Sequence, residues 1–536
     1  MSSTLDSNPP VEFPSPFDRS NCFPITLVEL RMRTFSGQIR EKPRWWEKVH
    51  NPEIMAKWRK EIVEQDEAVV NRFWGGEERF NEGRGEKKWP RDNITDAQLD
   101  YIFDELRYLA CQADLETGIQ RTSIDRIYQS MTLIPANLKA ALLDGASALE
   151  SVPQEQQDWH PGSNNQVLDL VHPSLYCLRI GKSPMIKSPP EGTDLLVFPT
   201  VEEYNKSRPD LKDAWELVVS QQHQWLPADF EVSAAGEVRP LGYINNLHLI
   251  THKPLYSTIA MILQCFVPLF ERVLSDSAAM NRPLAIHPEP MSWYEKETPE
   301  WDEDDESTRE RWEREFLWPV IHDPAPFVPP NPDKQALGTS KEWRRNIVAT
   351  GLYYYASENI TESKLGFRAG VGEYENGPYW DYQPDDSKGW TVAFGFGNTD
   401  PKNQEVGSIV AKEDKCLAFS NIYQHRVAPF ELEDPTKPGH RKILCFFLVN
   451  PFVPVASTSN VPPQQRSWYT DELDKVPQFL QLPQELLDII LNDALAGTIT
   501  LDEAKKEREK LMEERANFVV EHNQQIFEME FSMCEH

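Results

Sequence analysis

Apolar residues recur in the first half of the chain at the spacing of one face of a helix, which predicts an α-rich amino-terminal layer. A capping box at residues 95–98 marks the start of one of its helices. Residues 133–149 and 254–274 predict two more, and we expect the second, the most apolar, to pack between the helical layer and a sheet. The stripe residues of the first helices are Ile54, Met55, Trp58, Ile62, Val69, Val70, Leu99, Ile102, Phe103, Leu106 and Leu109.

Short apolar runs follow one another between residues 347 and 460 and predict a β-rich core. The runs are residues 346–355, 365–371, 390–396, 406–410, 416–419 and 443–449, with shorter candidate strands at 195–198, 224–226 and 230–232. The charged residues 412–415 separate the runs 406–410 and 416–419. This pattern favours two antiparallel strands joined by a loop.

After residue 465 the chain returns to helical patterns, first at 484–495 and then from a capping box at Thr500 and Glu503 to about residue 529. Leu511, Ala516, Phe518, Val519 and Ile526 form a stripe that predicts docking of this last helix. The patterns divide the chain into a flexible tail (1–22), a helical amino-terminal region (23–150), a mixed α/β region (151–330), a β core (331–465) and carboxy-terminal helices (466–536).

Composition and charge narrow the range of partners. With 85 acidic against 55 basic residues the chain carries a net charge of −30, which argues against binding to nucleic acid. The longest uncharged run, 254–270, is shorter than the roughly 20 residues of a membrane span, and the amino terminus has no signal-peptide pattern. The 7 cysteines follow neither a disulfide nor a zinc spacing. We expect a cytoplasmic protein without a membrane partner.

Residues 406–449 are the stretch where residue types and spacing indicate chemistry. His425 follows the second apolar run, and Arg441 opens the third, beyond a loop rich in Pro and Gly. A non-haem Fe(II) site uses two histidines and one carboxylate, and a guanidinium can clamp the carboxylate of a co-substrate. His425 is therefore a candidate metal ligand and Arg441 a candidate clamp. Taken alone, such residues are more often a core histidine and a surface arginine.

Long stretches of the chain resemble one family. They are residues 421–451 (NIYQHRVAPFELEDPTKPGHRKILCFFLVNP), 457–465 (STSNVPPQQ), 159–176 (WHPGSNNQVLDLVHPSLY), 243–248 (YINNLH) and 351–368 (GLYYYASENITESKLGFR). Together they resemble a large, mostly uncharacterised fungal family of unknown function whose carboxy-terminal half is similar to the Fe(II)/2-oxoglutarate-dependent oxygenases.

The resemblance implies an α+β fold with a double-stranded β-helix (jelly-roll or cupin-like) core, packed with amino- and carboxy-terminal helical regions. It also implies Fe(II) and 2-oxoglutarate as cofactors. His425 would be an iron ligand and Arg441 the co-substrate clamp. Tyr353, Tyr355 and Arg368 would line the pocket.

The chain departs from that family at residues 330–346. The family carries there a Trp-His-x-Glu motif that would supply the second histidine and the carboxylate, whereas here Trp343 is followed by two arginines. The segment is also shorter, as if a strand pair were missing, so we expect an incomplete β-helix. Four other histidines are interpreted as structural or solvated. They are His160 and His172, each before a proline, and His287 and His322, each near an acid in Pro-rich sequence.

Three hypotheses about function stay open. The first is an oxygenase-like oxidoreductase that acts on an unknown small organic substrate and whose iron site is impaired by the missing motif. The second is a non-catalytic relative that kept the fold as a binding or scaffold protein. The third is a shortened product of a gene whose full-length form is active. Because missing strands leave unpaired edges, self-association is also expected.

Overall fold

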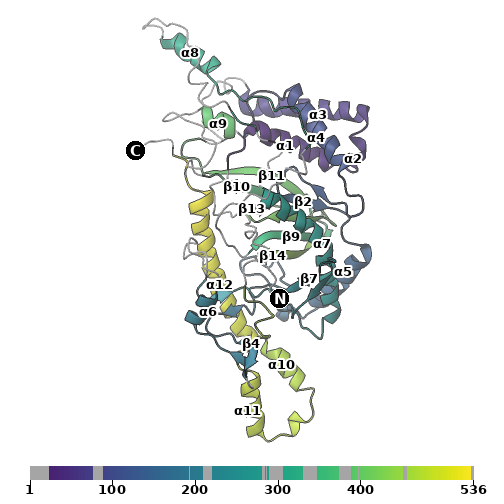
Figure 1. The fold of residues 1–536 in the computed structure, drawn as a ribbon, viewed down its shortest axis with the longest axis vertical. Helices are drawn as coiled ribbons and strands as arrows, with labels where there is room; N and C mark the ends of the chain where they lie inside the picture. Colours follow the sequence, from purple (N-terminus) through teal and green to yellow (C-terminus); the bar gives the residue numbers. More distant parts are fainter. Residues whose placement is uncertain are drawn as a thin grey trace, which may run out of the picture.

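A computed structural model of the 536-residue chain describes residues 23–75, 88–191, 194–208, 220–279, 284, 286–288, 306–329, 347–372, 388–395, 397–450 and 455–532. These residues form a mixed α/β fold with antiparallel sheets at its centre and helices around them (Figure 1). The two larger sheets do not close into a barrel within the described residues. The predicted mixture of helices and antiparallel strands is therefore confirmed, while a double-stranded β-helix is not.

The amino-terminal layer consists of four helices at one end of the molecule (Figure 1). They are α1 (Leu27–Arg40), α2 (Trp45–Lys48), α3 (Pro52–Trp74) and α4 (Asp96–Cys111). Thr95 caps α4 by accepting from the backbone N–H of Gln98 at 3.2 Å, as predicted. The Gln98 side chain does not return to the cap. It accepts from Arg31 at 2.6 Å and donates to Asp323 at 2.8 Å, because the buried Arg31 needs acceptors.

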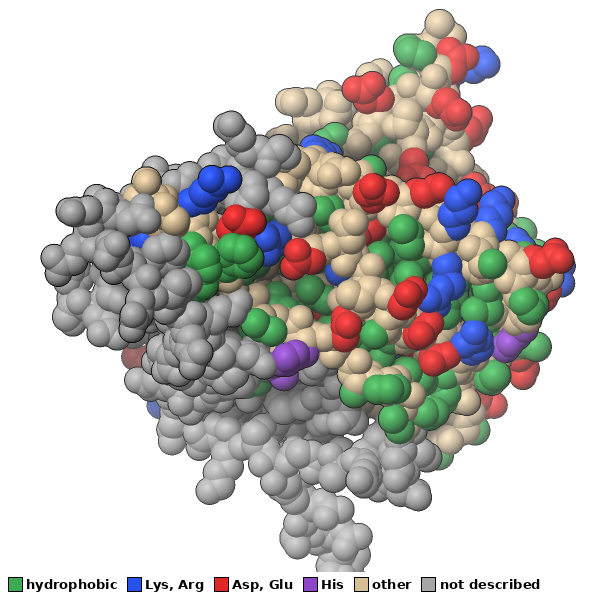
Figure 2. All heavy atoms as spheres, turned by 90° about the horizontal axis from the view of Figure 1, so that it is seen from above, with side chains coloured by type: hydrophobic (Ala, Val, Ile, Leu, Met, Phe, Trp, Pro, Cys, Tyr) green, Lys and Arg blue, Asp and Glu red, His purple; other side chains and the backbone are tan. Residues whose placement is uncertain are grey.

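Acidic and basic side chains are mixed on the described surface of this end of the molecule. Figure 2 shows red and blue side chains interspersed there rather than a field of one sign. The pairs include Arg59 with Asp96 and Asp100, and Lys42 with Glu61. The described part of this face therefore offers no basic patch of the kind that binds a phosphate backbone.

Two sheets form the centre of the fold. The five-stranded sheet has the order β1 (Gln120–Arg121), β2 (Ile127–Ser130), β12 (Cys416–Ser420), β9 (Ile347–Glu358), β14 (His440–Val449). The three-stranded sheet has the order β11 (Asn403–Ala411), β10 (Ser363–Gly370), β13 (Gln424–Val427). Leu365, Phe367, Ile409, Leu417 and Phe419 lie in one buried cluster that joins both sheets. The faces that meet there are called the inner faces below.

The predicted pairing of residues 406–410 with 416–419 is wrong. Both runs are strands, but β11 pairs with β10, whereas β12 lies between β2 and β9 in the other sheet. All five residues of β12 are buried. A strand that is apolar on both faces is stabilised by a place in the middle of a covered sheet, so the charged turn carries the chain from one sheet to the other.

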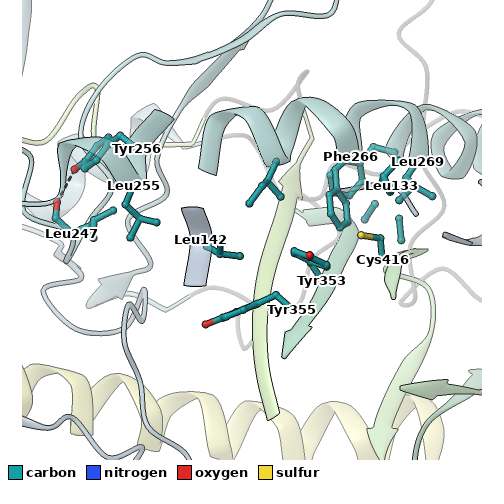
Figure 3. Close-up of a cluster of buried hydrophobic side chains, with 14 of the residues drawn as sticks. Leu133, Leu142, Leu247, Leu255, Tyr256, Phe266, Leu269, Tyr353, Tyr355 and Cys416 are labelled. Atoms are coloured by element: carbon teal, nitrogen blue, oxygen red, sulfur yellow. Dashed lines mark hydrogen bonds between the residues drawn. The ribbon is translucent and has the colours of Figure 1, made fainter. Parts of the chain in front are cut away.

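Two helices cover the outer face of the five-stranded sheet. They are α5 (Ala136–Glu150) and α7 (Lys253–Ala279), where the sequence predicts them (Figure 3). Phe266, Leu269 and Val273 of α7 are fully buried. By length and composition alone, the stretch Lys253–Ser277 would suffice to cross a membrane, contrary to the expectation from its uncharged run. In this fold its apolar side packs on the sheet.

The predicted strand at residues 390–396 is also wrong. The structure has a helix there, α9 (Gly389–Phe394), which ends at Gly395 with a φ of 82°. Trp390 packs on Phe394 and Phe531, and every residue of the helix is buried. A short helix buried on all sides has no amphipathic period, so its sequence reads like that of a buried strand.

The carboxy-terminal helices are α10 (Arg466–Leu473), α11 (Gln484–Ala494) and α12 (Leu501–His522). Both hydrogen bonds of the predicted capping box between Thr500 and Glu503 are present. A hydrogen bond between the buried His223 and Glu507 at 2.8 Å and an ion pair between Arg508 and Asp158 at 2.6 Å fasten α12 to the mixed region. The docking stripe is right only in part, because Leu511 and Ile526 are buried but Val519 is exposed.

Shorter elements complete the described chain. They are η2 (Gln154–Gln156), β3 (Leu178–Arg179), β4 (Met185–Glu191), β5 (Asp194–Val197), α6 (Val201–Ser207), β6 (His223–Gln224), β7 (Phe230–Val232), β8 (Val238–Pro240), α8 (Glu306–Phe316), η6 (Phe479–Gln481) and η7 (Asn523–Phe527). The strands among them pair as β3 with β6, β4 with β5 and β7 with β8.

Candidate functional site

His425 lies on β13 and faces the five-stranded sheet. It is the register partner of Phe367, whose side chain belongs to the buried cluster between the sheets. The imidazole packs against Phe419 and Phe367, with ring centroids 5.0 and 6.4 Å away. These apolar surroundings lower the pKa of His425, so the neutral ring is favoured, although the residue as a whole is open to solvent.

Arg441 lies on β14 and reaches across to the other sheet. Its Nη1 donates to the Oγ of Ser363 at 2.9 Å, and its guanidinium lies 4.5 Å from the ring centroid of Phe430 and 5.7 Å from that of Tyr354. Burial lowers the pKa of Arg441 from its usual value, but a guanidinium stays charged in a protein.

The Arg441 guanidinium has no carboxylate partner among the described residues. Neither Glu431 nor Asp434, two acids of the loop before β14, pairs with Arg441. Asp434 instead pairs with Lys437 at 2.9 Å, and its backbone N–H donates to the Oδ1 of Asn359 at 2.8 Å. In the part of the chain that the structure describes, a hydroxyl and two aromatic faces hold this half-buried cation, which is therefore suited to pair with an anion.

The strands that carry these two residues each lie at the end of a sheet within the described chain. Four apolar residues beside them are between 40 and 44 % exposed, and we call them the apolar edge: Val427, Phe430, Ile443 and Phe447. A small molecule that approaches Arg441 from this side would meet one cation in apolar surroundings. Apolar surroundings with a polar group that fixes orientation are one part of the usual character of a small-molecule site.

Tyr353 and Tyr355 lie on the opposite face of β9 from Arg441. Both are buried against α5 and α7, in one cluster with Phe266 and Leu142 (Figure 3). The tyrosine that the Arg441 guanidinium contacts is Tyr354, which lies between Tyr353 and Tyr355 in the strand. Successive strand residues point to opposite faces, so a shift of one residue exchanges the two sets. The structure therefore does not bring Tyr353 or Tyr355 to the predicted clamp.

Arg368 lies on the outer face of β10, where it binds the carboxy-terminal segment. Its Nη2 is 2.8 Å from the Glu528 carboxylate and donates to Asn523 at 2.9 Å, and its guanidinium lies 5.2 Å from the ring centroid of Phe527. These contacts fasten the end of α12 to the three-stranded sheet. Arg368 does not lie with Arg441.

Among the described residues, none of the other sequence candidates forms a ligand group with His425. Residues 330–346, where the family motif departs, lie outside the described residues, as does Glu289. His287 is exposed, and the carboxylate of Asp323 accepts hydrogen bonds from Thr95 at 2.7 Å and from Gln98 at 2.8 Å. Asp323 therefore has a structural role at the start of α4.

A second group of possible ligands lies in the mixed region. One ligand atom each from His160, Asp169 and His172 falls within 4.8 Å of the others. His160 Nδ1 is 2.8 Å from Asp169 Oδ2, and His172 Nδ1 is 2.6 Å from Ser174 Oγ. Both histidines are hydrogen-bonded, as predicted. Their proximity was missed, although the spacing His-x8-Asp-x2-His was visible in the sequence.

A buried network of side-chain amides holds the backbone next to His172. Asn246 donates to the carbonyl of His172 at 2.8 Å, and Gln464 donates to the carbonyls of Tyr176 and Cys177 at 3.0 and 3.1 Å. Gln465 joins the two sides by donating to Asn245 at 2.9 Å. Three of the stretches that carried the family resemblance thus meet in one place.

The histidine group and the apolar edge are neighbours. The ring centroid of Trp225 lies 6.1 Å from that of His172 and 5.7 Å from that of Phe447. The Arg515 guanidinium covers the same indole at 4.0 Å. A chain of aromatic contacts therefore connects the mixed region with the inner face of β14.

Family models account for most of this sequence. One, described as "Domain of unknown function DUF4246, N-terminal", matches residues 3–61, and another, described as "Protein of unknown function (DUF4246)", matches residues 96–345 and 342–472. The chain belongs to the DUF4246 family. The predicted membership of an uncharacterised family is thereby confirmed. No curated protein and no solved structure matches the chain, so the oxygenase resemblance stays a prediction.

The DUF4246 match supports one further observation about residues 330–346. The two matched parts meet at residues 342–345, inside the stretch where the sequence departs from the expected Trp-His-x-Glu motif. Among the described residues of this DUF4246 chain, His425 belongs to no group of three possible metal ligands. Fe(II) at His425 therefore does not fit the described residues, because it needs a second histidine and a carboxylate.

A small cavity of about 40 Å³ lies elsewhere in the DUF4246 chain, between α1 and α4. It is lined by three arginines, but each is paired with an acid: Arg33 with Asp125, Arg40 with Glu105 and Arg121 with Asp276. These charges neutralise one another. The cavity is therefore part of the packing between the helical layer and β1, and the candidate site remains at β13 and β14.

Proposed function

We propose that this protein is a relative of the Fe(II)/2-oxoglutarate-dependent oxygenases that binds a 2-oxo acid between its two sheets, with Arg441 as the carboxylate clamp. The observation that carries the proposal is the half-buried guanidinium of Arg441, which has no carboxylate partner among the described residues. An anionic ligand would supply the missing charge through two parallel N–H···O bonds.

The strand connections support the same proposal. The chain runs from β9 to the hairpin β10–β11 in the other sheet, returns to β12, crosses to β13 and returns to β14. Alternation between two packed antiparallel sheets is typical of jelly rolls, the group to which the double-stranded β-helix belongs. We propose that the described strands are the larger part of such a core.

The proposed activity is binding, without iron chemistry at His425. Since the described residues around His425 do not complete an iron site, no reaction step through iron follows from them. His425 would instead present a neutral imidazole to the ligand, because its pKa is lowered. This favours the non-catalytic relative over the active oxygenase, and substrate oxidation stays a prediction for a chain that contains the missing motif.

Thermal unfolding of the purified full chain with 2-oxoglutarate tests the proposal. At about 100 times its dissociation constant, a ligand of the folded state stabilises by about 2.7 kcal/mol, which for a chain of this length raises Tm by about 2 to 3 °C. We expect this increase in the parent protein and its loss in Arg441→Leu. Arg426→Leu is the matched control, because Arg426 lies on β13 next to His425 but on the outer face.

Two outcomes would contradict the proposal. One is a parent protein whose Tm does not respond to 2-oxoglutarate. The other is an Arg441→Leu variant that is folded by circular dichroism and still responds like Arg426→Leu. Succinate, which has both carboxylates but no keto group, distinguishes binding of a 2-oxo acid from binding of any dicarboxylate.

A further inference from the structure

We propose that His160, Asp169 and His172 form a binding site for a divalent transition-metal ion, with Zn²⁺ as the first ion to test. Two imidazoles and one carboxylate are a ligand set with which proteins hold Zn²⁺ while a fourth position stays open to water. One ligand atom from each side chain already lies within 4.8 Å of the others. The inference is independent of the proposed binding of a 2-oxo acid.

Coordination of Zn²⁺ would require small changes in the distances between these ligand atoms. Ligand atoms about 2.0 to 2.2 Å from a tetrahedral Zn²⁺ are about 3.4 Å apart. The 2.8 Å between His160 Nδ1 and Asp169 Oδ2 is a hydrogen bond, and the ion would replace its proton. Side-chain rotations that move the ligand atoms by about 1 Å would bring all three to the coordination distance.

The backbone that carries the ligands is fixed on both sides. His160 and Asp169 are joined through a bridge between Trp159 and Leu168, with the His160 N–H bonded to the Val167 carbonyl at 2.9 Å. The turn after His172 is held by the half-buried amide of Asn246, which donates to the His172 carbonyl at 2.8 Å. A metal site requires this kind of support, because loosely held ligands lose affinity.

The hydrogen bond of His172 leaves one ring nitrogen for an ion. Its Nδ1 is 2.6 Å from the Oγ of Ser174, a fully buried residue. The same Nδ1 accepts the backbone N–H of Ser174 at 3.3 Å, so the proton of the neutral ring lies on Nε2. In metal sites the histidine nitrogen that does not bind the ion almost always donates a hydrogen bond, so ion binding would shift the ring proton to Nδ1, which would donate it to the Ser174 hydroxyl. Nε2 of His172 is then the coordinating atom.

Charge and solvent access allow a cation at this place. The three ligand residues are half-buried, so an ion can enter and keep a water ligand. Arg508 and Arg515 both lie near His172. Asp158 neutralises Arg508 at 2.6 Å, and the Arg515 guanidinium lies over the Trp225 ring. Asp158 also accepts the backbone N–H of Asp169 at 2.8 Å, which places this neutralised pair directly behind the site.

Metal titration of the full chain without an affinity tag tests the inference. After removal of metal with a chelator, we expect calorimetry to show that one Zn²⁺ binds per chain. With Co²⁺ we expect the visible absorption of a tetrahedral site. His172→Ala and Asp169→Asn should each weaken binding by about tenfold or more. His252→Ala and His425→Ala should leave binding unchanged. His252 follows His248 by four residues, and its replacement controls for chance binding of the ion between these two histidines.

Asp169→Asn keeps the size of the side chain and a hydrogen-bond acceptor for His160, so a folding defect is not expected to account for its effect. Circular dichroism checks this for each variant. The inference is overturned if the parent chain binds no ion, if Asp169→Asn and His172→Ala both bind like the parent, or if binding is lost in His425→Ala or His252→Ala. The 2-oxoglutarate response of Tm is measured on the metal-free chain, so the two proposals can fail separately.

Discussion

At the scale of single residues, Arg31 and Asp66 form a charged pair that is almost completely buried. Both side chains are 1 % exposed, and Arg31 Nη1 is 3.3 Å from the Asp66 carboxylate. Asp66 also accepts from the Trp89 indole at 2.8 Å and from the backbone N–H of Ile94 at 2.6 Å. Burial lowers the pKa of Arg31 although Asp66 acts against this, so the charged pair depends on its full set of hydrogen bonds.

Replacing Asp66 tests that dependence. Asp66→Asn would leave Arg31 buried without its counter-charge, and we expect the free energy of unfolding of the helical layer to fall by about 3 to 5 kcal/mol. The measurement is urea denaturation followed by tryptophan fluorescence. Asp96→Asn is the control, because Asp96 pairs with Arg59 at an exposed position, where the loss should stay below about 1 kcal/mol. Equal losses in the two variants would refute the assigned role.

Local signals at single residues were largely predictable from the sequence. The caps at Thr95 and Thr500 depend on neighbours within one turn, and both are present. The side chain of Gln98 could not be predicted, because its partners Arg31 and Asp323 are brought to it by the fold. The same holds for the amide network beside His172, which joins residues from three distant stretches.

At the scale of elements, the approach of α7 to β9 depends on a glycine. A Cβ on Gly351 would lie 2.8 Å from Phe270 Cζ and 3.0 Å from Phe266 Cδ1. Real Cβ atoms are essentially never found within 3.0 Å of another heavy atom, so the phenylalanine rings or the helix that carries them would have to shift. The absence of a side chain at this strand position therefore allows the close approach of α7 to the five-stranded sheet.

Gly351→Ala should therefore destabilise the protein by about 1 to 3 kcal/mol, the usual effect of overfilling a packed core. Thermal unfolding with a chemical-denaturation cross-check would measure this. Gly366→Ala is the matched control, since Gly366 is also in a strand, on β10, and its added Cβ would meet only a carbonyl oxygen at 3.7 Å. A Gly351→Ala protein as stable as Gly366→Ala would mean that α7 can shift without loss.

The existence of elements was easier to predict than their pairing. The runs of β9, β10, β11, β12 and β14 were recognised, but the sheet to which each belongs depends on contacts over long sequence distances. The choice of Tyr353 and Tyr355 over Tyr354 shows the same limit. β9 is buried on both faces, so alternation alone does not reveal which face carries Arg441.

At the scale of the whole molecule, the apolar edge predicts self-association. Val427, Phe430, Ile443 and Phe447 lie next to strands that end their sheets within the described residues. We expect concentration-dependent dimers in sedimentation velocity, and Phe447→Lys should shift the population to monomers because it puts a charge on the edge. Val63→Lys on α3 is the control, since Val63 is equally exposed among charged neighbours. A parent chain that is monomeric at all concentrations would exclude this interface.

The pairing of β2 with β12 has a consequence for synthesis of the chain. Ser130 and Cys416 are register partners, separated by about 290 residues, and all four residues of β2 are buried in the finished sheet. At a translation rate of about 5 to 20 residues per second, β2 leaves the ribosome roughly 15 to 60 s before its partner strand is made. For this interval the side chains of Ile127 and Tyr128 lack the partner strand that covers them in the finished sheet, so we expect the nascent chain to benefit from chaperones that shield unpaired strands.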